Sequence, residues 1–182
     1  MGRAGKLIER ERKYRLTETA ARALEASLRE RGAKEHHEVQ ESIIFRDTAS
    51  HLKKDTLLRL RTVDGRRELT FKGPKKMLGL DKWREELNVD IGDGPILEVL
   101  LEMGFRPAVR YRKDSRIFDY DEVIVSVDRL GALGVFCEIE VADLDHDLDA
   151  VALDLGFDPD QYEPRGYPTM ASEAAKAREE RE

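Results

Sequence analysis

Several features that define common protein classes are missing from this chain. Its 182 residues include a single cysteine, Cys137, which excludes an intrachain disulfide and a cysteine-rich zinc site. No apolar run reaches the roughly 18 residues of a transmembrane helix, and the N-terminus has no signal-peptide core. The net charge of −6 argues against a basic protein that coats nucleic acid. These absences predict a cytoplasmic protein, mainly one compact domain, that binds neither a membrane nor nucleic acid.

Charge of both signs is what the chain has in excess. Charged residues make up 38% of it, whereas about 25% is usual for a soluble domain. Hydrophobic residues make up 40%, which is enough to form a core. Either the surface or an interior cavity must therefore be strongly ionic.

The charges follow the two-residue period of β-strands. Glu9, Glu11 and Lys13 occupy alternate positions, so a strand over 7–16 points all three toward one face. Seven further strands are predicted, and most repeat this alternation: 38–45, 56–63, 68–72, 83–89, 106–118, 122–129 and 136–142. Helices are expected at 17–31, 95–103 and 144–155, with a loop at 73–80.

The third helix is expected to carry an apolar stripe of Leu144, Leu148, Val151 and Leu155. Residues 159–182 are expected to form a Pro/Gly loop and a highly charged tail, with a loose helix as one option. The sequence does not decide whether the tail caps the tunnel or is disordered.

Two arrangements fit the alternating strands. An open sheet would expose the ionic face to water and pair opposite charges across strands. Alternatively, eight strands close around a lumen with the charges inside and the apolar face outward. Because at least five separate strands keep the same pattern, we predict the second arrangement. The expected fold is α+β: an eight-stranded antiparallel closed β-barrel with helices packed on the outside. Cys137, lying between inward acids, would face the apolar side.

A lumen of this kind favours a specific ligand chemistry. Its predicted acids are Glu9, Glu11, Glu86, Asp128, Glu138 and Glu140, and its predicted bases are Lys13, Arg59, Arg61, Lys72 and Arg84. Clustered arginines and lysines favour a polyanion such as a triphosphate, since both side chains bind phosphate oxygens. Carboxylates suit Mg²⁺ or Mn²⁺, which would bridge them to the phosphates.

These motifs, in this order, resemble the CYTH family, also called triphosphate tunnel metalloenzymes. The family includes class IV adenylate cyclases, thiamine triphosphatases and inorganic triphosphatases. The matching patterns are Glu-X-Glu-X-Lys at 9–13, Arg-X-Arg at 59–61, Thr-X-Lys at 70–72, Arg-X-Glu at 84–86 and the closing acids at 128–140. The run 69–74 is most similar to the cyclase-type branch. One position departs: Ser115 follows Lys113 where the family usually has arginine, with Arg110, Arg112 and Arg116 as possible replacements.

The resemblance implies roles for individual residues and a triphosphate tunnel as the fold. The implied metal ligands are Glu9, Glu11, Asp128, Glu138 and Glu140, holding Mg²⁺ or Mn²⁺. The implied triphosphate-binding residues are Lys13, Arg59, Arg61, Lys72, Arg84 and Lys113. The implied catalytic residues are Glu9, Glu11 and Lys13. The CYTH domain would span 1–158, followed by the C-terminal loop and charged tail at 159–182.

Three functions stay open at this point. The first is a metal-dependent hydrolase of inorganic or nucleoside triphosphates. The second is a class IV adenylate cyclase that converts ATP to cyclic AMP and pyrophosphate. The third is a polyphosphate- or nucleotide-binding module without turnover. The resemblance also suggests a homodimer, whereas the four histidines, His36, His37, His51 and His146, lack metal-ligand spacing and are expected at the surface.

Overall fold

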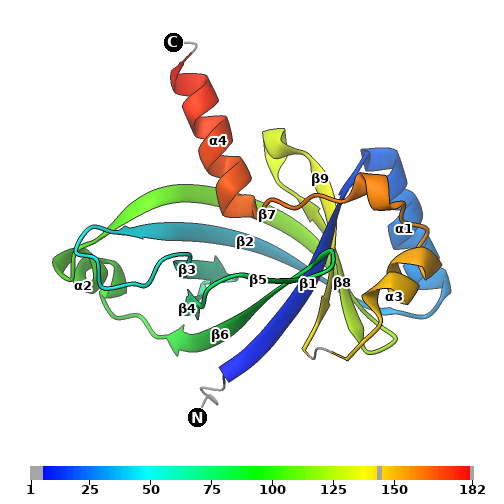
Figure 1. The fold of residues 1–182 in the computed structure, drawn as a ribbon, viewed down its shortest axis with the longest axis horizontal. Helices are drawn as coiled ribbons and strands as arrows, with labels where there is room; N and C mark the ends of the chain where they lie inside the picture. Colours follow the sequence, from blue (N-terminus) through cyan, green and yellow to red (C-terminus); the bar gives the residue numbers. More distant parts are fainter. Residues whose placement is uncertain (1–5, 143–144, 181–182) are drawn as a thin grey trace.

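The computed structural model describes residues 6–142 and 145–180. Within these ranges the chain forms nine strands and four α-helices (Figure 1). The strands are β1 (Lys6–Leu16), β2 (Lys34–Asp47), β3 (Leu57–Val63), β4 (Arg66–Lys72), β5 (Lys76–Leu78), β6 (Asp81–Ile91), β7 (Phe105–Tyr120), β8 (Val123–Arg129) and β9 (Val135–Val141). The helices are α1 (Glu18–Glu30), α2 (Ile96–Glu102), α3 (Leu148–Asp154) and α4 (Tyr167–Glu179).

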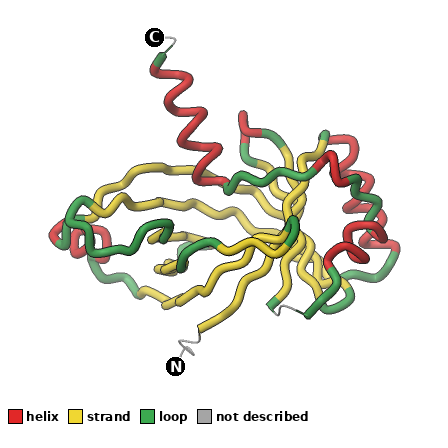
Figure 2. Tube along the Cα trace, in the orientation of Figure 1, coloured by secondary structure: helices red, strands yellow, loops and turns green. Residues whose placement is uncertain are grey.

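Eight of the strands close into an antiparallel barrel. The order around it is β1-β9-β8-β7-β2-β3-β4-β6, and β6 pairs with β1 to complete the ring. This register sets Glu9 opposite Arg84 on β6, and Lys13 opposite Glu138 on β9. The predicted α+β barrel is confirmed, and the tube in Figure 2 shows its strands running side by side.

The ninth strand corrects the expected loop at 73–80. Residues of β5 pair with the start of β6, with Lys76 opposite Trp83, in a hairpin that turns at Gly79 with a φ of +60°. The hairpin escaped the sequence pattern because β5 has only three residues and all of them are exposed. It lies beside the barrel ring rather than in it.

The apolar face of the barrel points outward and is covered by helices. Helices α1 and α3 pack on β7, β8 and β9, where Leu28, Val125 and Ile139 belong to one buried cluster. Cys137 is fully buried in the same cluster, as its position between inward acids predicts. Helix α2 covers a second patch, against Leu58 and Leu60 of β3. Figure 1 shows α1 and α3 together at one side of the barrel and α2 at the opposite side.

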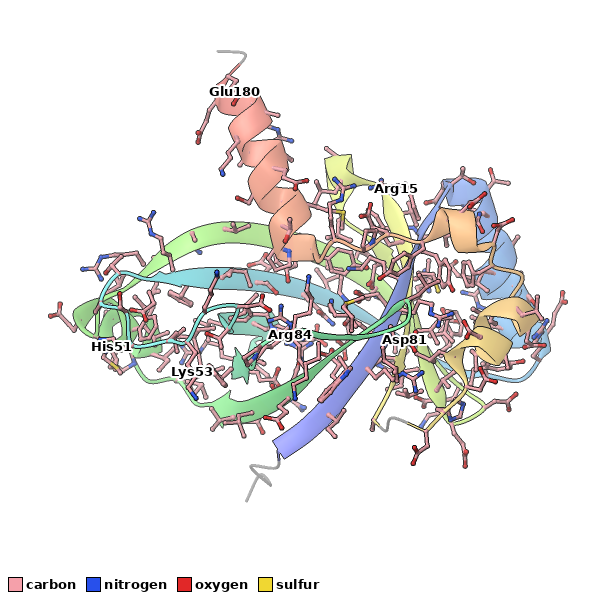
Figure 3. The ribbon with its side chains drawn as sticks, in the orientation of Figure 1. Arg15, His51, Lys53, Asp81, Arg84 and Glu180 are labelled. Carbon is pink, nitrogen blue, oxygen red and sulfur yellow. The ribbon has the colours of Figure 1, made fainter. Side chains whose placement is uncertain are left out.

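In the C-terminal part the third predicted helix is shorter than expected, and the tail takes the helical option. The third helix begins at Leu148 rather than at 144, because Asp147 caps it by accepting hydrogen bonds from Asp149 N and Ala150 N. Leu144, expected on this helix, lies outside the described residues. The tail forms the helix α4, which projects from the rim of the barrel toward Glu180 (Figures 1 and 3). Only Tyr167 and Met170 of α4 are buried, so the helix is attached by its first turn.

Candidate active site

A cavity of about 440 Å³ lies inside the barrel and is lined by residues from all eight strands of the ring. It contains every predicted triphosphate-binding residue: Lys13, Arg59, Arg61, Lys72, Arg84 and Lys113. Four of the five predicted metal-binding acids also line it: Glu9, Glu11, Glu138 and Glu140. The strand alternation therefore identified the inward face correctly.

Asp128 is the predicted ligand that does not line the cavity. Its side chain is fully buried, and it accepts hydrogen bonds from Ser115 Oγ at 2.7 Å, Tyr167 OH at 2.6 Å and Lys113 Nζ at 3.1 Å. Burial opposes ionisation of the carboxyl, but the Lys113 ammonium and these hydrogen bonds hold the pKa of Asp128 below its usual value. Asp128 is thus placed to hold Lys113 from behind the cavity wall.

Acids and bases pair directly inside the cavity. Lys72 Nζ lies 2.6 Å from Glu9 Oε2 and also pairs with Glu86. Lys13 Nζ lies 3.1 Å from Glu138 Oε1, and Lys82 pairs with Glu11. Each of these pairs brings a cation and a carboxyl group together in a largely buried space, where an unpaired charge would be costly.

The two arginines of β3, Arg59 and Arg61, have fewer of their hydrogen-bond donors satisfied. Arg61 Nη2 donates to Glu68 at 2.7 Å, and Arg59 Nη2 donates to Thr70 Oγ1 at 3.3 Å. The Nε atoms of both guanidinium groups are buried and have no hydrogen-bond partner in the described part of the chain. Both arginines line the cavity, and guanidinium groups in such a wall are suited to an anionic ligand with several oxygens.

Arg84 lines the cavity and has partners in two loops. Its Nη1 donates to the carbonyl of Gly73 at 3.2 Å, and its Nη2 lies 3.5 Å from Asp55 Oδ1. Both partners lie outside the strands, so loop residues orient this guanidinium. Arg84 is labelled among the side chains in Figure 3.

The cavity acids differ strongly in their affinity for protons. Burial raises the pKa of Glu86 to about 8, and a hydrogen bond with Glu9 adds to the shift. Burial also opposes ionisation of Glu9, yet Lys72 lowers the pKa of that carboxyl below its usual range. The Glu9–Glu86 pair therefore retains one shared proton near neutral pH.

Glu140 is the acid with the least compensation. Burial, followed by the charges of Glu9 and Glu11, raises its pKa well above the usual value. Within the described residues its carboxylate has no ion pair and no hydrogen bond, although it lies directly opposite Glu11 in the β1–β9 register. A carboxylate in this position is suited to a cation.

The donor set fits a hydrated divalent ion better than a closed metal cage. Among the described residues, no three histidine, cysteine, aspartate or glutamate side chains are already arranged to hold a metal. Mg²⁺, however, is commonly bound by one or two carboxylates together with water and substrate phosphates. Glu140 and the neighbouring Glu9, Glu11 and Glu138 supply hard oxygen ligands of this type beside the cations.

Three arginines were possible replacements for the arginine that the family usually has at Ser115, and all three lie outside the cavity. Arg116 Nη1 donates to Glu35 at 2.9 Å, Arg112 lies 3.8 Å from the exposed Glu41, and Arg110 is exposed. None of the three lines the cavity. Ser115 is fully buried, donates to Asp128 and does not line the cavity, so no arginine replaces the expected one at this point of the wall.

Sequence reasoning missed several lining residues. Lys82 shares the inward face with Arg84, but the predicted strand began one residue too late to include it. His36 lines the cavity as well, while its side chain stays 49% exposed, in agreement with the expected surface position. Tyr167 reaches the cavity from α4, and Tyr111 lines it from β7. The alternation around Lys113 could have indicated Tyr111, whereas no sequence signal indicates Tyr167.

Comparison with known proteins identifies the family. The sequence profile of the CYTH domain matches residues 7–167. The chain belongs to the CYTH domain family. The match extends beyond the expected domain end at 158, and that boundary, the homodimer and the cytoplasmic location stay predictions.

Named relatives of this CYTH protein include an archaeal sequence. A Methanocaldococcus jannaschii protein named "Putative adenylate cyclase" is 34% identical over 97 residues, which cover 53% of this chain. The matched part spans about half, 51%, of that relative's length.

Solved structures confirm the fold. A conserved hypothetical protein from Pyrococcus furiosus superposes with a TM-score of 0.76 at 24% identity, covering 89% of this chain and 99% of the other. A Hippeastrum protein, described as an adenylyl cyclase candidate with a dominant triphosphatase activity, superposes with a TM-score of 0.65 at 18% identity. That alignment covers 93% of this chain and 96% of the Hippeastrum protein. Among the described residues, none of the helices has the length and apolar content needed to span a bilayer.

Proposed function

We propose that this CYTH protein hydrolyses triphosphates in a reaction that depends on Mg²⁺ or Mn²⁺. The observation that carries the proposal is that six predicted triphosphate-binding bases and four predicted metal-binding acids line one cavity. Its volume, about 440 Å³, lies within the range of about 300–1,000 Å³ that is usual for small-molecule sites. The triphosphatase activity named for the structurally similar Hippeastrum protein agrees with this proposal.

The cations of the cavity would bind and orient the phosphate chain. Arg59 and Arg61 contribute guanidinium groups to the cavity wall, and Lys72 and Lys113 contribute charge from other strands. Held in this way, the phosphates would be neutralised and fixed relative to a water nucleophile, which is the main protein contribution in phosphoryl transfer. Lys13, next to Glu138, would place positive charge where negative charge develops on a phosphoryl oxygen.

The acids would hold the divalent ion. We assign this role to Glu9, Glu11, Glu138 and Glu140, and we assign Asp128 to the support of Lys113 because it lies behind the wall. When bound, the ion supplies Lewis-acid polarisation of a phosphoryl oxygen and additional positive charge. For a carboxylate such as Glu11 to bind the ion, its present pairing with Lys82 must open.

An adenylate cyclase is the second candidate, and two observations favour it. The Methanocaldococcus jannaschii relative is named for that activity. The cavity also has an apolar part, with Ile44, Leu57 and Tyr111 in its wall, which offers contacts to a nucleoside that inorganic triphosphate would not use. Cyclisation would require the ribose hydroxyl, rather than water, to be directed at the α-phosphorus.

A substrate screen tests these proposals. The protein is incubated with tripolyphosphate or ATP, with Mg²⁺, Mn²⁺ or a chelator. Metal-dependent phosphate release supports the hydrolase, and cyclic AMP with pyrophosphate supports the cyclase. Tight binding with neither product would show a binding module and refute both enzyme proposals.

A paired substitution tests the metal assignment. Glu9→Gln combined with Glu11→Gln removes two proposed ligands while leaving every cavity base, so turnover is expected to fall at least 100-fold. Binding of tripolyphosphate in the chelator should persist. Glu41→Gln, an outward acid with a 68% exposed side chain, is the matched control and should retain full activity. Near wild-type turnover in the double variant would contradict the assignment.

A further inference from the structure

The first residue of helix α4 closes one part of the cavity wall. Tyr167 is only 6% exposed, and its ring meets Phe136 edge-on with the centroids 5.5 Å apart. Tyr111 packs at 6.4 Å on another side. A residue outside the barrel strands is therefore fixed as part of the cavity lining.

The ring of Tyr167 contacts two of the cavity cations. Lys13 Nζ lies 3.8 Å from the ring centroid, and Lys113 Nζ lies 5.4 Å from it. Lys13 Nζ also donates to the carbonyl of Arg165 at 3.1 Å, two residues earlier in the chain. Two contacts of the Lys13 ammonium thus come from the first residue of α4 and from the segment just before it.

The phenol of Tyr167 is engaged at the same time. It donates to Asp128 Oδ2 at 2.6 Å, and Asp128 in turn accepts from Lys113. Burial and the adjacent Asp128 carboxylate raise the pKa of Tyr167 well above its usual value, so the hydroxyl remains a donor. Because the phenol donates its proton to the hydrogen bond with Asp128, we assign Tyr167 a positioning role rather than that of a general acid.

We propose that Tyr167 is a positioning residue that sets the locations of Lys13 and Lys113 in the cavity, by its ring and through Asp128, and thereby tunes affinity for the phosphate chain. The inference rests on the proposed triphosphate site and extends it, because it makes the start of α4 part of that site. Without the ring, Lys13 keeps Glu138 and the Arg165 carbonyl but loses the surface that confines its ammonium.

Two substitutions separate the contribution of the Tyr167 ring from that of its hydroxyl. Tyr167→Phe keeps the ring and removes the hydroxyl, whereas Tyr167→Leu removes both. Tripolyphosphate binding, measured calorimetrically in a chelator, is expected to weaken about 3-fold in the first variant and about 10- to 30-fold in the second, as expected for a buried cation–aromatic contact. Met170→Ala is the control because it loosens the same helix turn without contacting either lysine, and it should change affinity less than 3-fold.

A double-mutant cycle gives the decisive result. In a Lys13→Met background, Tyr167→Leu should weaken binding only about 3-fold, because the ring then has only Lys113 left to confine. Additive effects of the two substitutions would overturn the proposal. So would a loss of affinity in Met170→Ala equal to that in Tyr167→Leu.

A second measurement does not depend on any substrate. The Tyr167 ring at 3.8 Å should shift the NMR signals of the Lys13 ε-methylene, which Lys13→Met identifies by their disappearance. The shift should persist in Tyr167→Phe and vanish in Tyr167→Leu, and its absence from the wild type would refute the positioning role. If the shift is present but wild-type protein binds no triphosphate, the proposed function fails while the Lys13–Tyr167 contact stands.

Discussion

The contacts of Lys72 provide a quantitative test of the ionic interior. Its ammonium lies 2.6 Å from Glu9 Oε2 and also contacts Glu86, and its side chain is 14% exposed. Coulomb's law at an effective dielectric constant of about 20 gives a gross attraction of about 6 kcal/mol for the Lys72–Glu9 distance. Desolvation offsets most of this, but removing one partner strands the other charge, which typically costs about 3–5 kcal/mol.

We therefore expect Lys72→Met to lower the free energy of unfolding by about 3–5 kcal/mol. Glu9→Gln should cost less, about 1–2 kcal/mol, because Lys72 keeps Glu86 as a partner. The double variant should be at least about 2 kcal/mol more stable than the sum of the single effects predicts. Urea unfolding at pH 8 in a chelator, without phosphate ligands, measures all three values.

The control for this series is Lys76→Met. Lys76 lies in the exposed β5, over the ring of Trp83, and its loss should cost under about 1 kcal/mol. If Lys72→Met behaves like this control, or if the Lys72 and Glu9 effects add within about 0.5 kcal/mol, the interior pairs do not contribute as the structure indicates.

Three further predictions concern stability. Asp81 is 2% exposed and pairs with Arg10 and Arg12, so Asp81→Asn should lower the free energy of unfolding in urea by about 3–5 kcal/mol. The control Asp149→Asn changes an 83% exposed side chain and should cost under about 1 kcal/mol. Hydrogen bonds from arginines lower the pKa of Glu163 from 4.5 to about 2, so its contribution is complete above pH 4.5 and is lost as the pH falls toward 2. Because those arginines are nearly half exposed, Glu163→Gln should remove only about 1–2 kcal/mol at pH 7 and flatten the acid limb of the stability profile. Leu60→Ala should cost about 2–4 kcal/mol by thermal or urea unfolding, and a loss below 1 kcal/mol would show that the outward apolar face is not a packed core.

Strand alternation alone predicts much of the site. A two-residue period fixes which side chains of one strand share a face, so Glu9, Glu11 and Lys13 had to point the same way. The same rule placed Arg59 and Arg61 together, and all five line the cavity. Closure into a barrel then followed from the number of strands with one ionic face.

Alternation could not supply what depends on contacts between distant segments. Tyr167 follows the last barrel strand by 26 positions and belongs to a helix, so no period relates it to Lys13. The pairing of Ser115 with Asp128 depends on strands β7 and β8 lying side by side in one register. Lys82 was missed for a simpler reason, since strand ends are the least certain feature of a sequence pattern.

The paired charges explain how a cavity this ionic can exist in a folded chain. Every lysine named in the site has a carboxylate partner: Lys13 has Glu138, Lys72 has Glu9, Lys82 has Glu11 and Lys113 has Asp128. A phosphate chain entering alone would take lysines from their carboxylates, and a divalent ion entering alone would take carboxylates from their lysines. Either event leaves buried charge without a partner, whereas the two together replace each lost contact by a new one. Under the proposed function, the acids and bases of the wall would therefore exchange partners when both ligands bind. Asp128 would be the exception, because it stays behind the wall with Lys113 and Tyr167.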